Sequence, residues 1–337
     1  MEDYLNYTLN VLKSRNYVNL TIVLGNESCD LDSAVSSLVY ATFLHWQHQK
    51  MKCKVCTRNK RDESTYKDDI FVSLLDVDRQ DLPLKTEVAF CFKGHGLREN
   101  FLLFSYKDDV RSTIEIVGSC CTLVTQRIQD LSALMNRGDF FDDYEMCADL
   151  LHSVILLDTV NFSKEVNKAT PHDKDKVEFL ENILKPSDCM EERKLKVQRL
   201  VEARSDVELL NAAQLLRKDV KILGDVLIPS FPILVEVYLR KPEALKAVSE
   251  ALSQRNCTVA LLLGMDLTGV LRRDGAIISD DAEKVELFSK ILQEWSSPCL
   301  QLSPEENSDC FFFKQLNLSA SRKQYIAPVN EFLNNCN

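Results

Sequence analysis

The sequence predicts an α/β protein with a doubly wound, mostly parallel sheet and a second, smaller α/β domain. Short apolar or β-branched runs alternate with helix-like stretches in the first half, as in parallel sheets with helical crossovers. The 337 residues exceed the usual size of one domain. With 45% hydrophobic and 27% charged residues, the chain also has enough apolar material for packed cores.

The first domain, residues 1–162, begins with the clearest pattern. Residues 19–24 (Asn-Leu-Thr-Ile-Val-Leu) predict a strand that ends at Gly25, and apolar residues at helical spacing between Val35 and Trp46 predict a helix directly after it. Residues 51–69 are basic and then acidic without periodicity, which favours a solvated insertion. Further strands are expected at residues 70–75, 88–92, 101–104 and 114–117.

A polar break at residues 163–175 predicts the linker to the second domain, residues 176–337. The first part of that domain is charged and helix-prone. Its expected elements are helices within 176–204 and 208–223, strands at 227–239 and 258–263, and an apolar run at 311–313 followed by a helix ending near Leu333.

Charge and cysteine content limit the classes of function. A formal charge of -10 argues against nucleic-acid binding, which needs clustered Lys and Arg. No stretch has the apolar length of a membrane span or a signal peptide, so we expect a cytoplasmic protein. The 12 cysteines show no framework spacing and are expected to be reduced. Cys53 and Cys56 have metal-like spacing, but a second pair is missing and a solvated loop is favoured.

Two carboxylates follow the predicted strand 19–24. Asp30 and Asp32 stand at its carboxyl end, where ligands settle in open α/β sheets, and carboxylate oxygens suit Mg²⁺ or Mn²⁺. On these residues alone another interpretation is favoured, because Asp32 and Ser33 also stand where a helix N-cap belongs.

The surrounding residues resemble a known family. Residues 22–33 are similar to the first metal motif of the DHH phosphoesterase superfamily, in the form found in Prune proteins and related exopolyphosphatases. Residues 1–5, 74–84 and 117–125, the last with a Gly-Ser-Cys segment, follow the same template, so the resemblance covers nearly the whole chain. It implies a DHH-type domain followed by a substrate-binding domain of DHHA2 type.

The resemblance also implies site residues and ligands. Asp158 lies in the segment 151–161, which looks like the family motif whose aspartate binds metal. The alternative interpretation is that Asp158 is an ordinary polar residue at the end of a buried helix or strand. The implied metal ligands for Mn²⁺ or Mg²⁺ are Asp30, Asp32 and Asp158. The implied contacts with polyphosphate, pyrophosphate or a nucleotide phosphoester are Asn26, Lys221, Arg322 and Lys323. Taken singly, the basic clusters at 216–221 and 321–323 are more often solvated charge runs.

One part of the family pattern is missing. The Asp-His-His triplet of the family does not occur in this sequence. Compared with the family pattern, the segment that would contain the triplet is missing near residues 109–111. His152 stands in an apolar run and is interpreted as a core residue rather than a substitute ligand. Two functions follow as hypotheses: a metal-dependent hydrolase of phosphoanhydride or phosphoester bonds, or a catalytically impaired Prune-like protein that binds a nucleoside diphosphate kinase.

Overall fold

The computed structural model describes the chain except residues 27, 52–67, 98–102, 105–116, 308 and 337. The chain forms two compact units. The first comprises Met1–Leu82, Glu87–Lys164 and Lys168–Leu200, and the second comprises Pro83–Thr86, Glu165–Asn167 and Val201–Asn337. The predicted α/β class with a smaller second domain is confirmed. The main division falls after Leu200, later in the chain than the expected linker at 163–175.

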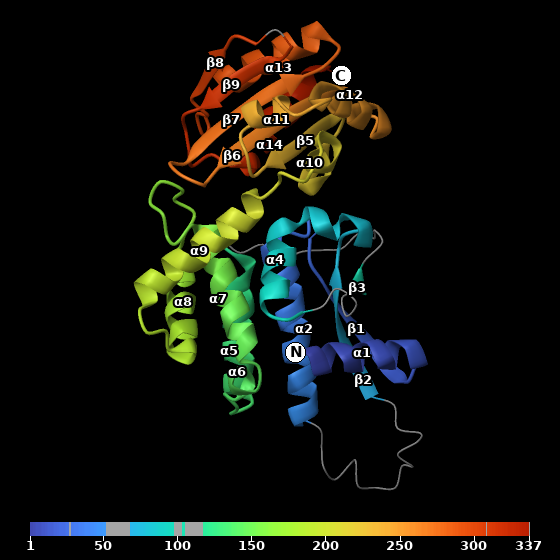
Figure 1. Ribbon diagram of the computed structural model, residues 1–337, viewed down its shortest axis with the longest axis vertical. Helices are drawn as coiled ribbons and strands as arrows, with labels where there is room; N and C mark the ends of the chain where they lie inside the picture. Colours follow the sequence, from blue (N-terminus) through green and yellow to red (C-terminus); the bar gives the residue numbers. More distant parts are fainter. Residues whose placement is uncertain (27, 52–67, 98–102, 105–116, 308, 337) are drawn as a thin grey trace. The chain divides into compact units, whose positions relative to one another are not determined.

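The first unit contains a parallel sheet with the order β1-β2-β3 and a group of helices (Figure 1). Its elements are α1 (Glu2–Ser14), β1 (Tyr17–Leu24), α2 (Leu31–Met51), β2 (Asp68–Leu75), the 3₁₀ helix η2 (Arg79–Leu84), α4 (Thr86–Gly94), β3 (Leu103–Phe104), α5 (Cys120–Leu134), α6 (Phe140–Asp143), α7 (Glu145–Thr159), α8 (Pro171–Leu184) and α9 (Cys189–Ser205).

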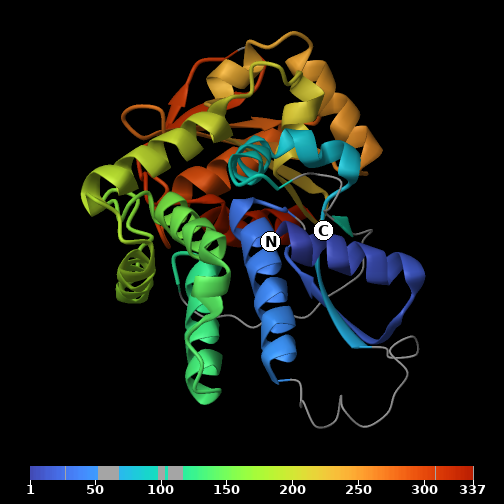
Figure 2. The same ribbon diagram turned by 60° about the horizontal axis from the view of Figure 1, so that its bottom comes forward.

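Helix α2 is the centre of the first unit. Its apolar and small residues are buried around most of its circumference, from Leu31 to Trp46, as expected for a helix covered on several sides. It packs on β1, β2, α5 and α7, and Figure 2 shows α2, α5 and α7 running side by side. The predicted strand, loop and helix at residues 19–46 are therefore confirmed.

The predicted strand at residues 88–92 is wrong, because these residues belong to helix α4. Val88, Cys91 and Phe92 are buried, whereas Phe90 is 47% exposed. The buried residues therefore follow the i, i+3, i+4 spacing of one helix face and not the alternation of a strand. The strand at 70–75 is confirmed as β2, and that at 101–104 is confirmed for Leu103–Phe104. The Cys53–Cys56 pair, most of the predicted insertion, residues 109–111 and nearly all of 114–117 lie outside the described residues.

The second unit is a six-stranded mixed sheet with the order β4-β5-β6-β7-β9-β8 and helices on both faces. Its elements are α10 (Ala212–Lys218), β4 (Val220–Leu223), β5 (Val226–Phe231), α11 (Val235–Leu239), α12 (Ala244–Gln254), β6 (Val259–Asp266), β7 (Arg272–Ile278), α13 (Ala282–Glu294), β8 (Leu302–Glu305), β9 (Phe311–Gln315) and α14 (Arg322–Cys336).

Strand β6 shows why this sheet is covered on both faces. Its run of apolar residues does not alternate with polar ones, which is typical of a strand buried on two sides. Ala260 and Leu262 pack with α10, α11 and α12. Leu261 and its neighbours on the opposite face pack with Phe288 of α13 and Phe332 of α14.

Two expected elements of the second half are divided differently. Residues 208–223 were expected as one helix, but the helix is only α10, which begins after the capping residue Asn211 and is followed by β4. The strand expected at 227–239 ends at Phe231, and α11 begins at Val235 after the N-cap residue Leu234. Among the described residues, no helix combines the length and apolarity needed to cross a bilayer.

Candidate functional site

The loop between β1 and α2 holds the first group of predicted site residues. Gly25 follows β1, and a Cβ placed there would lie 2.0 Å from Ser33 Oγ, so no larger residue fits. The backbone N–H of Asn26 donates a hydrogen bond to Ser33 Oγ at 2.7 Å. Asn26 Oδ1 in turn accepts from the backbone N–H and the hydroxyl of Ser28. Hydrogen bonds between residues of the loop and the first turn of α2 therefore stabilise its conformation.

Asp30 is the residue that caps α2. Its Oδ1 accepts a hydrogen bond from the Ser33 backbone N–H at 3.0 Å, which satisfies one of the open N–H groups of the first turn. The sequence-based alternative placed this role at Asp32 and Ser33, and that assignment is wrong. The helix begins at Leu31, so Asp32 already lies within the first turn.

Asp32 instead joins α2 to α5. Its Oδ1 accepts from Ser119 Oγ and the Cys121 N–H, and its Oδ2 accepts from the Cys120 N–H, all at 2.9 Å. A carboxylate at a helix N-terminus is favoured by both the open N–H groups and the helix dipole. Asp32 thus caps a helix that begins 88 residues later in the chain.

Asp158 lies close to the same helix start. It is the penultimate residue of α7, and the next residue, Thr159, lies against Gly118, where an added Cβ would meet Thr159 Cγ2 at 2.9 Å. Desolvation raises the pKa of the Cys120 thiol, and the negative charges of Asp32, Asp158 and Asp30 raise it further. The three predicted metal ligands therefore all lie in the first unit and near enough to Cys120 for their charges to raise its pKa.

Two carboxylates that were not predicted belong to this region. Asp173 is fully buried and accepts hydrogen bonds from the Gly118 N–H, the Thr122 hydroxyl and the Thr170 N–H. Burial raises its pKa, but these hydrogen bonds outweigh that effect and lower it. The capping-box spacing of Thr170 and Asp173 was a usable signal in the sequence.

Asp76 directly follows β2. Because Leu24 and Leu74 pair in parallel, Asp76 and the loop after β1 lie at the same edge of the sheet. The topology could have identified this residue, since ligands in such sheets bind beyond the carboxyl ends of the strands.

The carboxylates of this region are chemically suited to bind a hard cation, but their positions do not form a complete set of metal ligands. Carboxylate oxygens are the ligands that Mg²⁺ and Mn²⁺ prefer. However, across the described parts of the chain no three His, Cys, Asp or Glu side chains converge closely enough to hold a metal ion. Asp32 is occupied by three protein donors, and Asp158 lies 3.6 Å from the Lys168 ammonium.

The predicted basic residues lie in the second unit. Lys221 is exposed on β4, opposite Ile228 of β5. The guanidinium of Arg322 donates to the carbonyls of Asp219 and Ile228 and to the Asp219 carboxylate, at 3.2, 3.4 and 2.9 Å. Arg322 therefore fastens α14 to the β4–β5 pair next to Lys221. Lys323 is exposed in the first turn of α14.

His152 is buried, as the sequence predicted, and takes part in a network of charged side chains. Its ring nitrogens contact Glu181 Oε1 and the Lys196 ammonium, each at 3.1 Å. Glu181 also binds Arg193 through two contacts of 2.6 Å. Burial, followed by the charge of Lys196, lowers the pKa of His152. This network connects α7, α8 and α9.

Comparison with known proteins finds a domain family for the second half of the chain and a solved structure with a similar fold. Residues 198–332 match the DHHA2 domain family. The fold resembles the crystal structure of a Methanococcus jannaschii protein assigned to the family II inorganic pyrophosphatases, with a TM-score of 0.57 and 18% identity over 94% of this chain and 99% of that chain. The chain has a two-domain α/β fold of this kind, and its second unit contains nearly all of the DHHA2 match.

Curated relatives are similar to this chain over nearly its whole length. The chain is 27% identical to the exopolyphosphatase PRUNE1 of Homo sapiens and 27% identical to that of Mus musculus, over 99% of this chain and 79% of each relative. The chain is therefore similar over almost its whole length to Prune exopolyphosphatases, and its residues 198–332 match the DHHA2 domain. The human alignment spans 389 positions, more than the 337 residues of this chain, so that relative carries residues without a counterpart here.

Proposed function

We propose that this chain is a divalent-cation-dependent phosphohydrolase that acts on short polyphosphate or pyrophosphate. The observation that supports the proposal is that Asp30, Asp32 and Asp158 all act electrostatically on Cys120 at the start of α5, where Asp32 also accepts a hydrogen bond from the Cys120 N–H. The chain is also similar over almost its whole length to proteins named exopolyphosphatases. Other phosphoesters, such as nucleotides, are the alternative substrates.

The three carboxylates are the proposed ligands of one Mg²⁺ or Mn²⁺ ion, and Asp76 is a further candidate at the same edge. A bound cation supplies positive charge that neutralises phosphoryl oxygens during transfer. Asp32 also keeps the N-terminus of α5 in place through its three hydrogen bonds. Asn26, exposed in the same loop, is proposed to contact the substrate.

Lys221, Arg322 and Lys323 are proposed to bind phosphate oxygens. The two lysines are exposed and offer mobile point charges. Arg322 makes three contacts within its own unit, so we assign it mainly to positioning β4 and its Lys221.

Release of phosphate from tripolyphosphate in the presence of Mn²⁺ tests this proposal. Asp30→Ala should abolish release above background. Asp188→Ala is the matched control, because Asp188 is exposed and caps α9 in the same way, through hydrogen bonds from the N–H groups of Met190 and Glu191. Its activity should equal that of the wild type. Wild-type release no faster than that of Asp30→Ala contradicts the hydrolase proposal.

A second function has a specific observation in its favour. Asp30, Asp32 and Asp158 all contact protein groups, and the described residues offer no convergent set of three ligands. A catalytically impaired Prune-like protein that binds a nucleoside diphosphate kinase would have such a region. Capture of purified kinase by wild type and Asp30→Ala alike, together with no phosphate release, supports this function over hydrolysis.

A further inference from the structure

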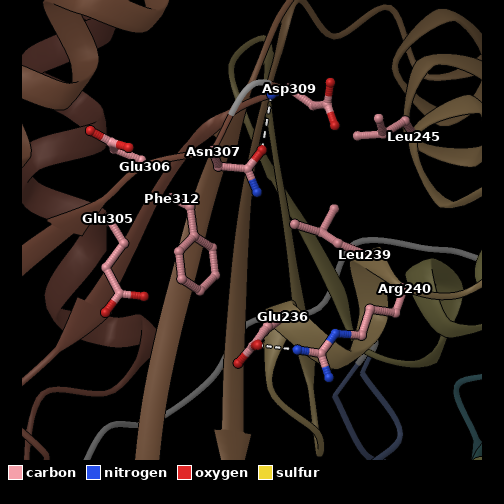
Figure 3. A pocket seen from close by; sticks show the side chains of 9 residues that line it. All are labelled: Glu236, Leu239, Arg240, Leu245, Glu305, Glu306, Asn307, Asp309 and Phe312. Carbon is pink, nitrogen blue, oxygen red and sulfur yellow. Dashed lines mark hydrogen bonds and ion pairs between the residues drawn. The ribbon is translucent and has the colours of Figure 1, made fainter.

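A pocket on the second unit lies apart from the residues considered above (Figure 3). Its cavity of about 360 Å³ is formed by α11 and the residue after it, the start of α12, the end of β8, the start of β9 and residues between these two strands. It opens on the sheet face that carries α10, α11 and α12. This volume is at the lower end of the range for ligand pockets and suits one or two side chains.

Carboxylates from three segments surround the cavity. Glu236 and Glu305 have cations of their own, since they pair with Arg240 and Lys314. Glu306 and Asp309 are exposed, and the ion pairs found among the described residues include neither of them. The pocket therefore presents excess negative charge to solvent.

The floor of the pocket is apolar. Phe312 is only 6% exposed, and Leu245 is 39% exposed at the start of α12. In Figure 3 the ring of Phe312 and the side chain of Leu239 point into the space between the charged residues. An apolar floor with carboxylates above it matches a side chain that has an aliphatic stem and a cationic head.

We propose that this pocket docks a segment of a partner protein in which Lys or Arg alternates with an aliphatic residue. The pairing of Arg240 with Glu236 shows that a guanidinium fits among these carboxylates. Glu306 and Asp309 receive the cationic head of the incoming side chain, while Leu245 and Phe312 contact its stem and the neighbouring aliphatic residue. Opposite charges of this kind add specificity and speed to association.

Fluorescence anisotropy with the labelled peptide Leu-Arg-Leu-Lys-Leu-Arg and the full-length chain tests the proposal. At about 50 mM salt, where screening is modest, we expect saturable binding. The double variant Glu306→Gln/Asp309→Asn should weaken it by about tenfold, and Leu245→Ser should weaken it by about threefold. Far-UV circular dichroism checks that these surface variants are folded.

The control is the double variant Glu286→Gln/Glu331→Gln. It removes the same charge from exposed positions on α13 and α14, which cover the opposite face of the sheet. Its binding should stay within about twofold of the wild type, because distant exposed charges are screened. Equal weakening by both double variants, spermine binding as tight as that of the peptide, or no saturable binding overturns the proposal.

Discussion

At the residue scale, Asp32 has a structural task that exists before any ligand binds. Three donors of residues 119–121 converge on its carboxylate, and such charge-assisted bonds are stronger than neutral ones. The proposed cation site and the packing of α2 on α5 would therefore both depend on this one side chain.

Asp32→Asn should lower the free energy of unfolding by about 1–3 kcal/mol, because the amide keeps one acceptor oxygen and places N–H groups against N–H donors. Urea denaturation in the presence of EDTA measures this effect without bound metal. The exposed Asp142→Asn serves as control and should shift the midpoint little. An unchanged midpoint for Asp32→Asn contradicts the capping role.

His95 predicts a pH dependence of stability. Burial lowers its pKa, but hydrogen bonds to Asp149 and to Cys91 outweigh that effect and raise it to about 10. Because the folded pKa exceeds the unfolded one, the stabilisation is fully present below about pH 6.5 and is lost as pH rises through about 10.

His95→Gln should therefore lower stability by about 1–2 kcal/mol more at pH 6 than at pH 10, after allowance for partial solvent screening. Urea denaturation of both proteins at the two pH values measures the difference. The same loss at both pH values would show that protonation of His95 adds nothing.

At the element scale, α11 is held by a buried carboxylate. Asp274 of β7 accepts hydrogen bonds from the N–H groups of Val235 and Glu236 at 2.7 and 3.0 Å. Burial raises its pKa to about 6, although these two hydrogen bonds oppose the shift. Ionisation of Asp274 is thus harder in the folded chain than in the unfolded one.

The raised pKa of Asp274 means that the folded state binds more protons between about pH 4 and 6. Its contribution to stability is greatest below about pH 4 and falls as pH rises through about 6. Relative to Asp274→Asn, the wild type should lose about 1–2 kcal/mol over this interval. Urea unfolding of both proteins at pH 4.5 and pH 7 tests this prediction. If the stability of the wild type relative to Asp274→Asn increases from pH 4.5 to pH 7, the prediction is contradicted.

The junction of α5, α7 and α8 is packed around Gly118. A Cβ at this position would lie 2.8 Å from Asp173 Oδ2 and 2.9 Å from Thr159 Cγ2. Gly118→Ala should destabilise the chain by about 1–3 kcal/mol through overpacking, as measured by thermal or urea unfolding. Gly138→Ala is the matched control, since nothing lies within 4 Å of a Cβ there; comparable losses in both variants would contradict the packing argument.

Local patterns explain which elements could be predicted from the sequence. Strand β1, the loop after it and α2 could be predicted because their signals come from residues that are close together in the sequence, within about one helical turn or one strand. Residues 88–92 are apolar enough for a strand, and only the helical burial of α4 decides between the two structures. The cap that Asp32 provides for α5 joins residues 88 apart, so no local pattern could indicate it.

At the scale of the whole molecule, the two units divide the predicted site residues. Asn26, Asp30, Asp32 and Asp158 belong to the first unit, and Lys221, Arg322 and Lys323 belong to the second. The family resemblance suggested this division, but not its position along the chain. Residues 170–175 looked like a linker because they are polar, yet Asp173 is buried and binds Gly118.

Binding of Mn²⁺ to the full-length chain, measured by isothermal titration calorimetry, tests the central claim most directly. We expect one saturable site in the wild type and its loss in Asp158→Asn, with Asp188→Asn retaining it. Absence of saturable binding in the wild type, or equal binding by wild type and Asp158→Asn, would contradict a cation site built from Asp30, Asp32 and Asp158.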